Sequence, residues 1–367
     1  MSAPLSRRGD TGTTVAEIRD RLGRLGIMPA AEPGFDPANA SFDDSVDHAV
    51  RAFQQARGLT VDGIVGPQTF RRLEEARWTL GDRVLSYRPG RLVSGDDVLG
   101  LQQRLSGLGF DLGRVDGVFG PLTDHALREF QRSVGVDPDG TCGPMTFRAI
   151  NRLARTMSGG GTATTLRELH ALESICSGVA HKVVVIDPGH DGGDDGHGVN
   201  EAAIAGDLAT RVEGRLAAIG VQVLLTRKPD SGSAADESDR AAFANDTGAD
   251  LVLSLNVGSA DSAIPSGCAS FYFGDSAAGT GSALGRRFAE MVQEEICSRT
   301  DLTDCQSHAK TWDLLRMTRM PAVRLECGYL SSPHDARRLA DPAFRDAVAE
   351  GIAAAVVRFF APVTTEA

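Results

Sequence analysis

The sequence predicts two small all-α units of three helices each, followed by an α/β domain with a mostly parallel sheet and helices on both faces. Three observations lead to this prediction. A helical segment and a glycine-rich turn recur in the first half of the chain, a Gly/Ser/Thr-rich stretch follows, and continuous apolar runs then alternate with amphipathic segments. A chain of 367 residues is long enough for two or three such domains.

The turn that recurs has the form D-G-x-x-G-P-x-T. VDGIVGPQTF at 61–70 returns as PDGTCGPMTF at 138–147, and a further copy, VDGVFGPLT, lies at 115–123. Repetition on this scale indicates a duplicated supersecondary unit. We therefore predict two related units at 12–76 and 94–154.

Each unit is expected to contain three short helices. In DDSVDHAVRAFQQARG the apolar residues fall on one helical face, and Gly58 supplies the C-terminal stop. In the turn, Gly63 and Gly66 are expected at positive φ, and Pro67 at the first helical position, where its missing N–H costs nothing. The opening helix of the second unit has an apolar face made of Val98, Leu101, Leu105 and Leu108.

A linker is predicted over 155–181, and the α/β domain over 182–361. KVVVIDPGH is a continuous apolar run, as expected for a strand with both sheet faces covered. The further strands expected are VQVLLTR, DLVLSLN, ASFYFG and PAVRLECGYL, and the helices are EAAIAGDLATRVEGRLAAIG, SALGRRFAEMVQEEI and AFRDAVAEGIAAAVVRFF. Loops after the carboxyl ends of the strands build the site in such sheets.

Composition and charge exclude several classes of protein. A net charge of −11 argues against a nucleic-acid surface, and no stretch is long and apolar enough to span a bilayer. The N-terminal segment has two arginines without a following apolar run, so it is not a secretory leader and we expect a cytoplasmic protein, or a cell-wall protein if another route exports it. The six cysteines show no metal-ligand spacing and are expected to be reduced and mostly buried, although Cys297 and Cys305 flank a short loop and remain candidates for a bridge under oxidation.

Polar residues gather where the predicted strands end. The first strand ends in Asp187-Pro188-Gly189-His190, Glu201 opens the next helix, and Asn256 and Glu326 end two further strands. Carboxylates and an imidazole at strand ends are typical of a metal site. A hydrolytic zinc needs three protein ligands and one open position for water.

The repeated helical pattern resembles the three-helix type of peptidoglycan-binding domain, with a helical scaffold that binds no ligand as the alternative. The C-terminal part, in IDPGHDGG, NEAAIAGDLA, SDRAAFAN and PAVRLECGYLSSPHD, resembles the zinc-dependent N-acetylmuramoyl-L-alanine amidase family. The resemblance implies cleavage of the bond between the lactyl group and the stem peptide, with His190 and Glu201 as zinc ligands. It also implies substrate binding by Arg240 and Asn245, and catalysis by Glu326, which takes the proton of a zinc-activated water and passes it to the leaving amine.

One ligand position departs from the family pattern. Where the family has its second histidine ligand, SLNVG places Asn256, and a neutral amide is a poor substitute for imidazole on zinc. We therefore expect zinc binding to be weakened or absent. His197 is a possible substitute ligand, and His308 a weaker one. Without metal, Glu326 is expected to pair with an arginine such as Arg240.

Two functions follow from the resemblance. One is an active zinc amidase that cuts peptidoglycan. The other is a pseudoenzyme that regulates wall synthesis in the cytoplasm, because two binding units before such a domain resemble actinobacterial amidase-like regulators. Its partners would be peptidoglycan, a muropeptide or a lipid-linked precursor, a wall-synthesis enzyme, and a Ser/Thr kinase acting on Thr364 or Thr365. A scaffold without ligand is the third alternative.

Overall fold

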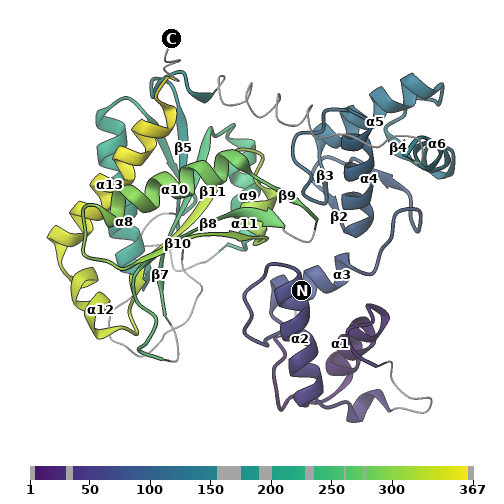
Figure 1. Cartoon of the computed structure of the whole chain (residues 1–367), viewed down its shortest axis with the longest axis horizontal. Coiled ribbons are helices and arrows are strands. Elements are labelled where there is room, and N and C mark those ends of the chain that lie inside the picture. The colour runs from purple at the N-terminus through teal and green to yellow at the C-terminus, as the bar shows by residue number, and fades with distance from the viewer. Residues whose placement is uncertain are drawn as a thin grey trace. The chain divides into compact units, whose positions relative to one another are not determined.

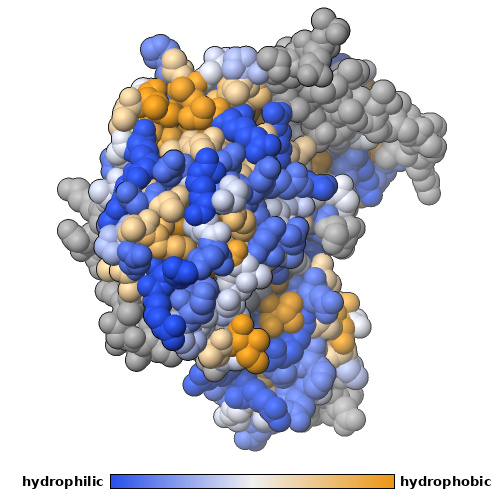
Figure 2. Space-filling model, turned by 60° about the vertical axis from the view of Figure 1, so that its left-hand side comes forward, coloured by the Kyte–Doolittle hydropathy of each residue, from blue (hydrophilic) through white to orange (hydrophobic). Residues whose placement is uncertain are grey.

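A computed structural model describes residues 5–29, 36–154, 175–189, 201–227, 235–259, 262–275 and 278–362. The chain divides into a helical N-terminal unit and an α/β C-terminal unit (Figure 1). None of the helices within these described ranges is long and apolar enough to cross a membrane. The face of the molecule in Figure 2 is mostly hydrophilic, with smaller groups of hydrophobic residues between.

The N-terminal unit contains six α-helices among its described residues, three in each predicted repeat. They are α1 (Thr13–Arg24), α2 (Asp44–Ala56), α3 (Pro67–Glu75), α4 (Asp96–Gly107), α5 (Pro121–Val134) and α6 (Pro144–Ala154), with a 3-10 helix η1 at Pro37–Asn39. Two short antiparallel pairs, which the sequence did not predict, join β1 (Leu85–Ser86) to β4 (Thr141–Cys142) and β2 (Val93–Ser94) to β3 (Val118–Phe119). Each repeat has its own apolar core.

The backbone of the turn differs from the prediction at one glycine. Gly63 has φ 76° and Pro67 occupies the first turn of α3, as expected. The prediction for Gly66 is wrong, because Gly66 has φ −85° and is the residue that precedes the helix. A residue in that position needs extended backbone, which does not require a left-handed conformation.

A buried glutamine explains why the turn motif recurs three times. The Gln102 amide nitrogen donates to Asp116 Oδ1 (3.0 Å), to the turn's threonine (3.1 Å) and to a backbone carbonyl, and its oxygen accepts from the Gly117 N–H (2.7 Å). Gln54 and Gln131 make the same set of bonds to the other two copies. Buried polar groups are costly unless they are hydrogen-bonded. The Asp, Gly and Thr of each motif therefore serve to pair the polar atoms of the buried glutamine side chain.

The α/β unit contains one mixed sheet, in which six strands follow the order β10-β8-β11-β7-β5-β6. The four strands β11, β7, β5 and β6 are parallel, as predicted, whereas β8 runs antiparallel to β11 and β10 runs parallel to β8. The strands are β5 (Val183–Pro188), β6 (Gln222–Leu225), β7 (Leu251–Gly258), β8 (Cys268–Asp275), β9 (Thr280–Gly281), β10 (Asp304–Lys310) and β11 (Ala322–Tyr329). The helices are α8 (Glu201–Ala218), α9 (Glu237–Asp246), α10 (Ala283–Cys297), α11 (Asp313–Met317), α12 (Pro333–Ala340) and α13 (Pro342–Phe360).

Helices cover both faces of this sheet, as the sequence predicted. Val184 and Ile186 of β5 belong to a core that includes residues of α8, α10, α12 and α13. Val185, between them, belongs to a second core that includes residues of α9 and α11. Successive side chains of a strand point to opposite faces, so strands buried on both sides show the continuous apolar runs seen in the sequence.

Part of the predicted linker packs against the α/β unit. The Gly178 N–H donates to the Phe360 carbonyl (2.8 Å), and the Cys176 thiol donates to the Phe359 carbonyl (3.4 Å). These bonds attach residues 175–181 to the end of α13. Residues 155–174 of the predicted linker lie outside the described residues.

Candidate functional site

The polar residues of the candidate site share one face of the sheet. Val184, Leu253 and Leu325 point to the α8/α10/α13 core, so residues an odd number of positions away point to the other face, which α9 and α11 cover. That face receives Asp187 of β5, Ser254 and Asn256 of β7, and Arg324 and Glu326 of β11. Asn256 and Glu326 are direct neighbours in the parallel register, so the predicted grouping at the strand ends is present for these two residues.

Asp187 is the centre of a buried hydrogen-bond network. Its carboxylate is fully buried (0% exposed) and accepts from Thr226 Oγ1 (2.5 Å), Ser254 Oγ (2.7 Å) and Arg240 Nη1 (2.7 Å). A buried carboxylate is tolerated when its charge and its lone pairs are both compensated, and this set of donors does both. Arg240 was expected to bind substrate. In the structure it forms an ion pair with Asp187, and its side chain is only 10% exposed.

Asn256 is attached to the same network. Its side-chain nitrogen donates to Ser254 Oγ (3.0 Å), and the residue is 4% exposed. Ser254 already gives its single proton to Asp187, so it can only accept from Asn256, which fixes the orientation of the amide. The amide oxygen then points at Gly189, where an added Cβ would lie 1.9 Å from it. Gly189 therefore makes room for Asn256 just before His190, which lies outside the described residues.

Glu326 is held by its own strand. Tyr329 donates its hydroxyl to Glu326 Oε2 (2.7 Å), and Arg324 Nη2 lies 3.7 Å from Oε1. Burial and the nearby negative charge of Glu326 raise the pKa of Tyr329, so the phenol remains a donor at neutral pH. The expectation that Glu326 pairs with an arginine is confirmed, but the partner is Arg324; Arg240, the arginine named as the example, pairs with Asp187 instead.

An aromatic side chain with cations around it lies beside Glu326. The Arg324 guanidinium is 4.8 Å from the Trp312 ring centre, and Lys310 Nζ is 5.7 Å from it. The Phe271 ring packs against the same indole at 4.8 Å. Burial lowers the pKa of Lys310, while the charge of Glu326 opposes that change. These contacts place two cationic side chains and an indole ring close to the Glu326 carboxylate.

The sequence analysis missed these surrounding residues. Strand alternation in RLECGY would have placed Arg324 on the same face as Glu326, two positions away. Lys310 ends β10 and Trp312 follows it, and the mostly polar sequence of this strand, DCQSHAK, gave no strand signal.

Two further predicted residues, Asn245 and His308, lie elsewhere in the fold. Asn245 donates to the Met317 carbonyl (2.9 Å) and accepts from the Arg319 N–H (2.8 Å), so its amide joins α9 to the end of α11 and to the segment that follows. His308 is exposed on the edge strand β10, where a ring nitrogen lies 2.7 Å from the Cys305 carbonyl oxygen, and two strands separate β10 from β7. His197 lies outside the described residues.

The described residues supply only part of a zinc ligand set, because the expected ligand His190 lies outside them. A catalytic zinc site needs three nitrogen, sulfur or carboxylate ligands. Glu201 begins α8 and supplies a carboxylate, but Asn256 supplies only a neutral amide oxygen, and its nitrogen is already committed to Ser254. Within the described ranges, no group of three His, Cys, Asp or Glu side chains is arranged to hold a metal ion.

Two family profiles match the chain. One, described as N-acetylmuramoyl-L-alanine amidase, matches residues 184–358, and one described as a peptidoglycan binding domain matches residues 11–73 and 94–150.

Individual relatives extend these matches. The chain is 45% identical over 365 residues to the N-acetylmuramoyl-L-alanine amidase CwlM of Mycobacterium tuberculosis, and the match covers 96% of this chain and 89% of that protein. It is 28% identical over 186 residues to the amidase LytC of Bacillus subtilis, covering 50% of this chain and 36% of LytC. Among solved structures, the catalytic domain of the amidase CwlV from Bacillus (Paenibacillus) polymyxa aligns with a TM-score of 0.44 and 29% identity, over 48% of this chain and 97% of that one.

Proposed function

This chain belongs to the N-acetylmuramoyl-L-alanine amidase family, and from that premise we propose that it binds peptidoglycan or muropeptide-like precursors without cleaving them and regulates peptidoglycan synthesis. Its two peptidoglycan-binding domains support the choice of ligand.

The state of Asn256 carries the proposal. The Asn256 amide nitrogen donates to Ser254, and Ser254 in turn donates to the buried Asp187. The amide nitrogen of Asn256 therefore already has a hydrogen-bond partner within the protein. Losing even an outer-shell partner of a metal ligand costs about 10–100-fold in metal affinity or activity, and replacing a ligand costs more. We therefore propose that zinc binding is weakened or absent and that the ligand is held without hydrolysis.

The zinc content of the purified full-length protein tests this proposal. We expect little zinc and no muropeptide cleavage in the unaltered protein, and tighter zinc binding by more than about 100-fold in Asn256→His. Asn256→Ala is the matched control, because it also removes the bond to Ser254 but adds no ligand. The double variant Asn256→His/Glu326→Gln should keep the added zinc and show no cleavage. Stoichiometric zinc together with cleavage by the unaltered protein would refute the proposal, and His197 would then be the first ligand to replace.

An active amidase is the second candidate, favoured by the placement of Glu326. Its carboxylate is oriented by Tyr329 and faces the same side of the sheet as Asn256, as a general base beside a bound amide would need. If this function holds, the unaltered protein releases the stem peptide from muropeptide and Glu326→Gln abolishes the release. Asp207→Asn, on a surface of α8, should leave it unchanged.

The partners of a regulator form a further part of the proposal. We propose that the bound precursor controls contact with a wall-synthesis enzyme and that a Ser/Thr kinase modifies Thr364 or Thr365, which lie outside the described residues. A phosphate would add about two negative charges to this segment. Mass spectrometry of the protein from growing cells tests the second point, and a uniformly unmodified tail would remove it.

A further inference from the structure

Arg324 is a charged residue in an inner strand of the sheet. β11 lies between β8 and β7, and Arg324 is directly opposite Phe271 on one side and Ser254 on the other. Its side chain is 14% exposed, and its neighbours in the strand, Val323 and Leu325, are fully buried. A charge in such a place is costly unless it is compensated, and a buried ion pair often stabilises a fold no more than apolar side chains of similar volume do. The stability of the sheet therefore does not account for Arg324, whose contacts lead to the site.

Three side chains from different segments hold the Arg324 guanidinium. Nη1 lies 3.6 Å from Glu237 Oε1 of α9, and Nη2 lies 3.7 Å from Glu326 Oε1 of the same strand. The ring centre of Trp312, which follows β10, is 4.8 Å from the guanidinium carbon. Glu237 is held in turn, because its other oxygen accepts from the Leu314 N–H of α11 (3.2 Å). The guanidinium can leave Glu326 only by also losing its contacts with Glu237 and Trp312.

Both carboxylate oxygens of Glu326 have a partner within β11. Oε2 accepts from the Tyr329 hydroxyl (2.7 Å), and Oε1 is the oxygen nearest Arg324. The neighbours of Glu326 across the sheet, Asn256 of β7 and Ala269 of β8, are both uncharged. A general base takes up a proton from water, and a carboxylate paired with a guanidinium has to give up that ion pair to do so. Arg324 therefore occupies the oxygen that Tyr329 leaves open.

We propose that Arg324 is a positioning residue that prevents Glu326 from acting as a general base, so that a ligand bound beside Glu326 is not hydrolysed. This inference deepens the proposed function and rests on it. In the proposed function Asn256 weakens the binding of zinc, whereas Arg324 acts on the carboxylate and would still do so with the metal restored. The two effects concern neighbouring residues, because Asn256 and Glu326 are paired directly in the parallel register.

Chemical modification of Glu326 in the full-length protein, without added metal, tests the inference. A carbodiimide with glycine ethyl ester modifies carboxylates, and peptide mapping by mass spectrometry gives the rate at Glu326. Arg324→Met keeps an unbranched side chain beside Trp312 but removes the charge. It should raise the rate at Glu326 at least about 5-fold, as expected for the loss of one partly exposed ion pair. Arg324→Lys, which keeps the charge, should restore most of the protection.

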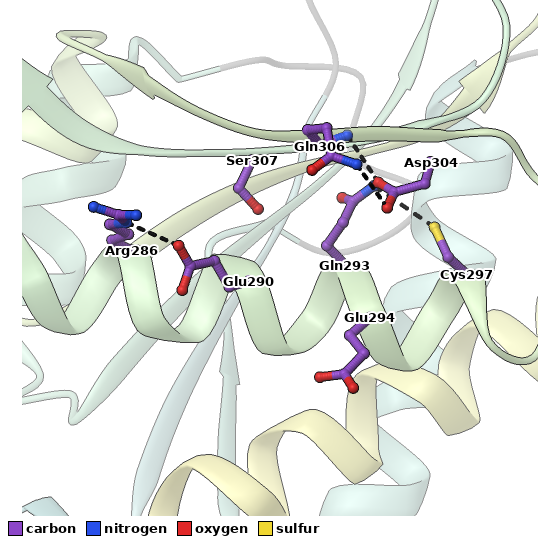
Figure 3. Close-up of a pocket in the computed structure, with 8 residues that line it drawn as sticks. All are labelled: Arg286, Glu290, Gln293, Glu294, Cys297, Asp304, Gln306 and Ser307. Atoms are coloured by element: carbon purple, nitrogen blue, oxygen red, sulfur yellow. Dashed lines mark hydrogen bonds and ion pairs between the residues drawn. The ribbon is translucent and has the colours of Figure 1, made fainter.

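Arg286→Met is the matched control. Arg286 and Glu290 form an ion pair at 2.8 Å and line a pocket between α10 and β10 (Figure 3). Their side chains are 63% and 54% exposed, so solvent already reaches Glu290. The control should change the rate at Glu290 by less than about 2-fold and leave the rate at Glu326 unchanged. If Arg324→Met fails to fold, Arg324→Gln takes its place, because it also removes the charge and keeps a polar side chain.

Cleavage of muropeptide provides a second measurement, in the Asn256→His background. Asn256→His/Arg324→Met should cleave at least about 10-fold faster than Asn256→His at equal zinc content, because a general base contributes about 100-fold or more. An unchanged modification rate at Glu326 in Arg324→Met, no protection in Arg324→Lys, or slower cleavage by the double variant would overturn the role of Arg324. Failure of the proposed function is seen separately, as zinc-dependent cleavage by the unaltered protein. The modification rates need no metal and decide the role of Arg324 whether or not Asn256→His binds zinc.

Discussion

Replacing Asp187 with Asn tests whether the buried network holds the site together. The substitution keeps the shape of the side chain but removes the charge that compensates Arg240, whose nitrogen lies 2.7 Å from the carboxylate. It also replaces one acceptor oxygen by a donor, which then faces the hydroxyl of Thr226 or of Ser254. The structure therefore predicts both an uncompensated cation and a mismatched hydrogen bond.

The expected cost follows from the burial of this pair. Breaking a buried ion pair by removing one partner costs about 3–5 kcal/mol in the free energy of unfolding. Asp207→Asn is the matched control, since Asp207 also accepts from two arginines, at 2.7 and 2.5 Å, but its side chain is 37% exposed. Exposed pairs contribute about 0–1 kcal/mol, so the control should lose at least about 2 kcal/mol less than Asp187→Asn.

Denaturant unfolding measures this difference. Trp312 packs in the core beside the site, so its fluorescence reports the α/β unit, and Trp78→Phe removes the signal of the other tryptophan. The double variant Asp187→Asn/Arg240→Met should be more stable than the sum of its single variants predicts, by more than 1 kcal/mol, because both charges are gone. Equal losses for Asp187→Asn and Asp207→Asn would refute the assignment of Asp187 as a buried, charge-compensated centre.

Three further outcomes are expected. Gly189→Ala should destabilise the α/β unit by about 1–3 kcal/mol in denaturant unfolding, because the new Cβ would lie 1.9 Å from the Asn256 oxygen. Adding Asn256→Ala in the same chain should recover most of the lost stability, and no recovery would contradict the contact. Gln102→Ala should cost about 3 kcal/mol by circular dichroism melting of the helical unit, since it orphans a buried N–H, whereas the exposed neighbour Gln103→Ala should cost under about 0.5 kcal/mol. Burial raises the pKa of Asp207, but its two arginine partners outweigh burial and lower it. The contribution of Asp207 to the free energy of unfolding is therefore present above its unfolded pKa of about 3.9 and is lost as pH falls through the lower folded pKa. Asp207→Asn should thus make the thermal midpoint less sensitive to acid, and an unchanged pH profile would contradict this.

The sequence by itself determined the repeated helical unit, the strands β5, β6, β7, β8 and β11, and the neighbours at the strand ends. Parallel strands present their carboxyl ends at one edge, so the apolar runs before Asn256 and Glu326 were enough to bring these residues together. The three D-G-x-x-G-P-x-T turns likewise predicted a repeated unit. Only the structure showed that each turn surrounds a buried glutamine.

Only the tertiary structure decided which partners the functional-looking residues take. Arg240 pairs with Asp187, 53 positions away, and Asn256 is drawn into the same network through Ser254. The Cys268 thiol of β8 donates to Gln293 Oε1 of α10, 25 positions away. The hydrophobic periodicity of a segment predicts which face of a strand or helix a side chain occupies. It does not predict which residue of another segment contacts that side chain. The pairing of charges, amides and thiols across distant segments therefore depends on how the sheet and its helices pack.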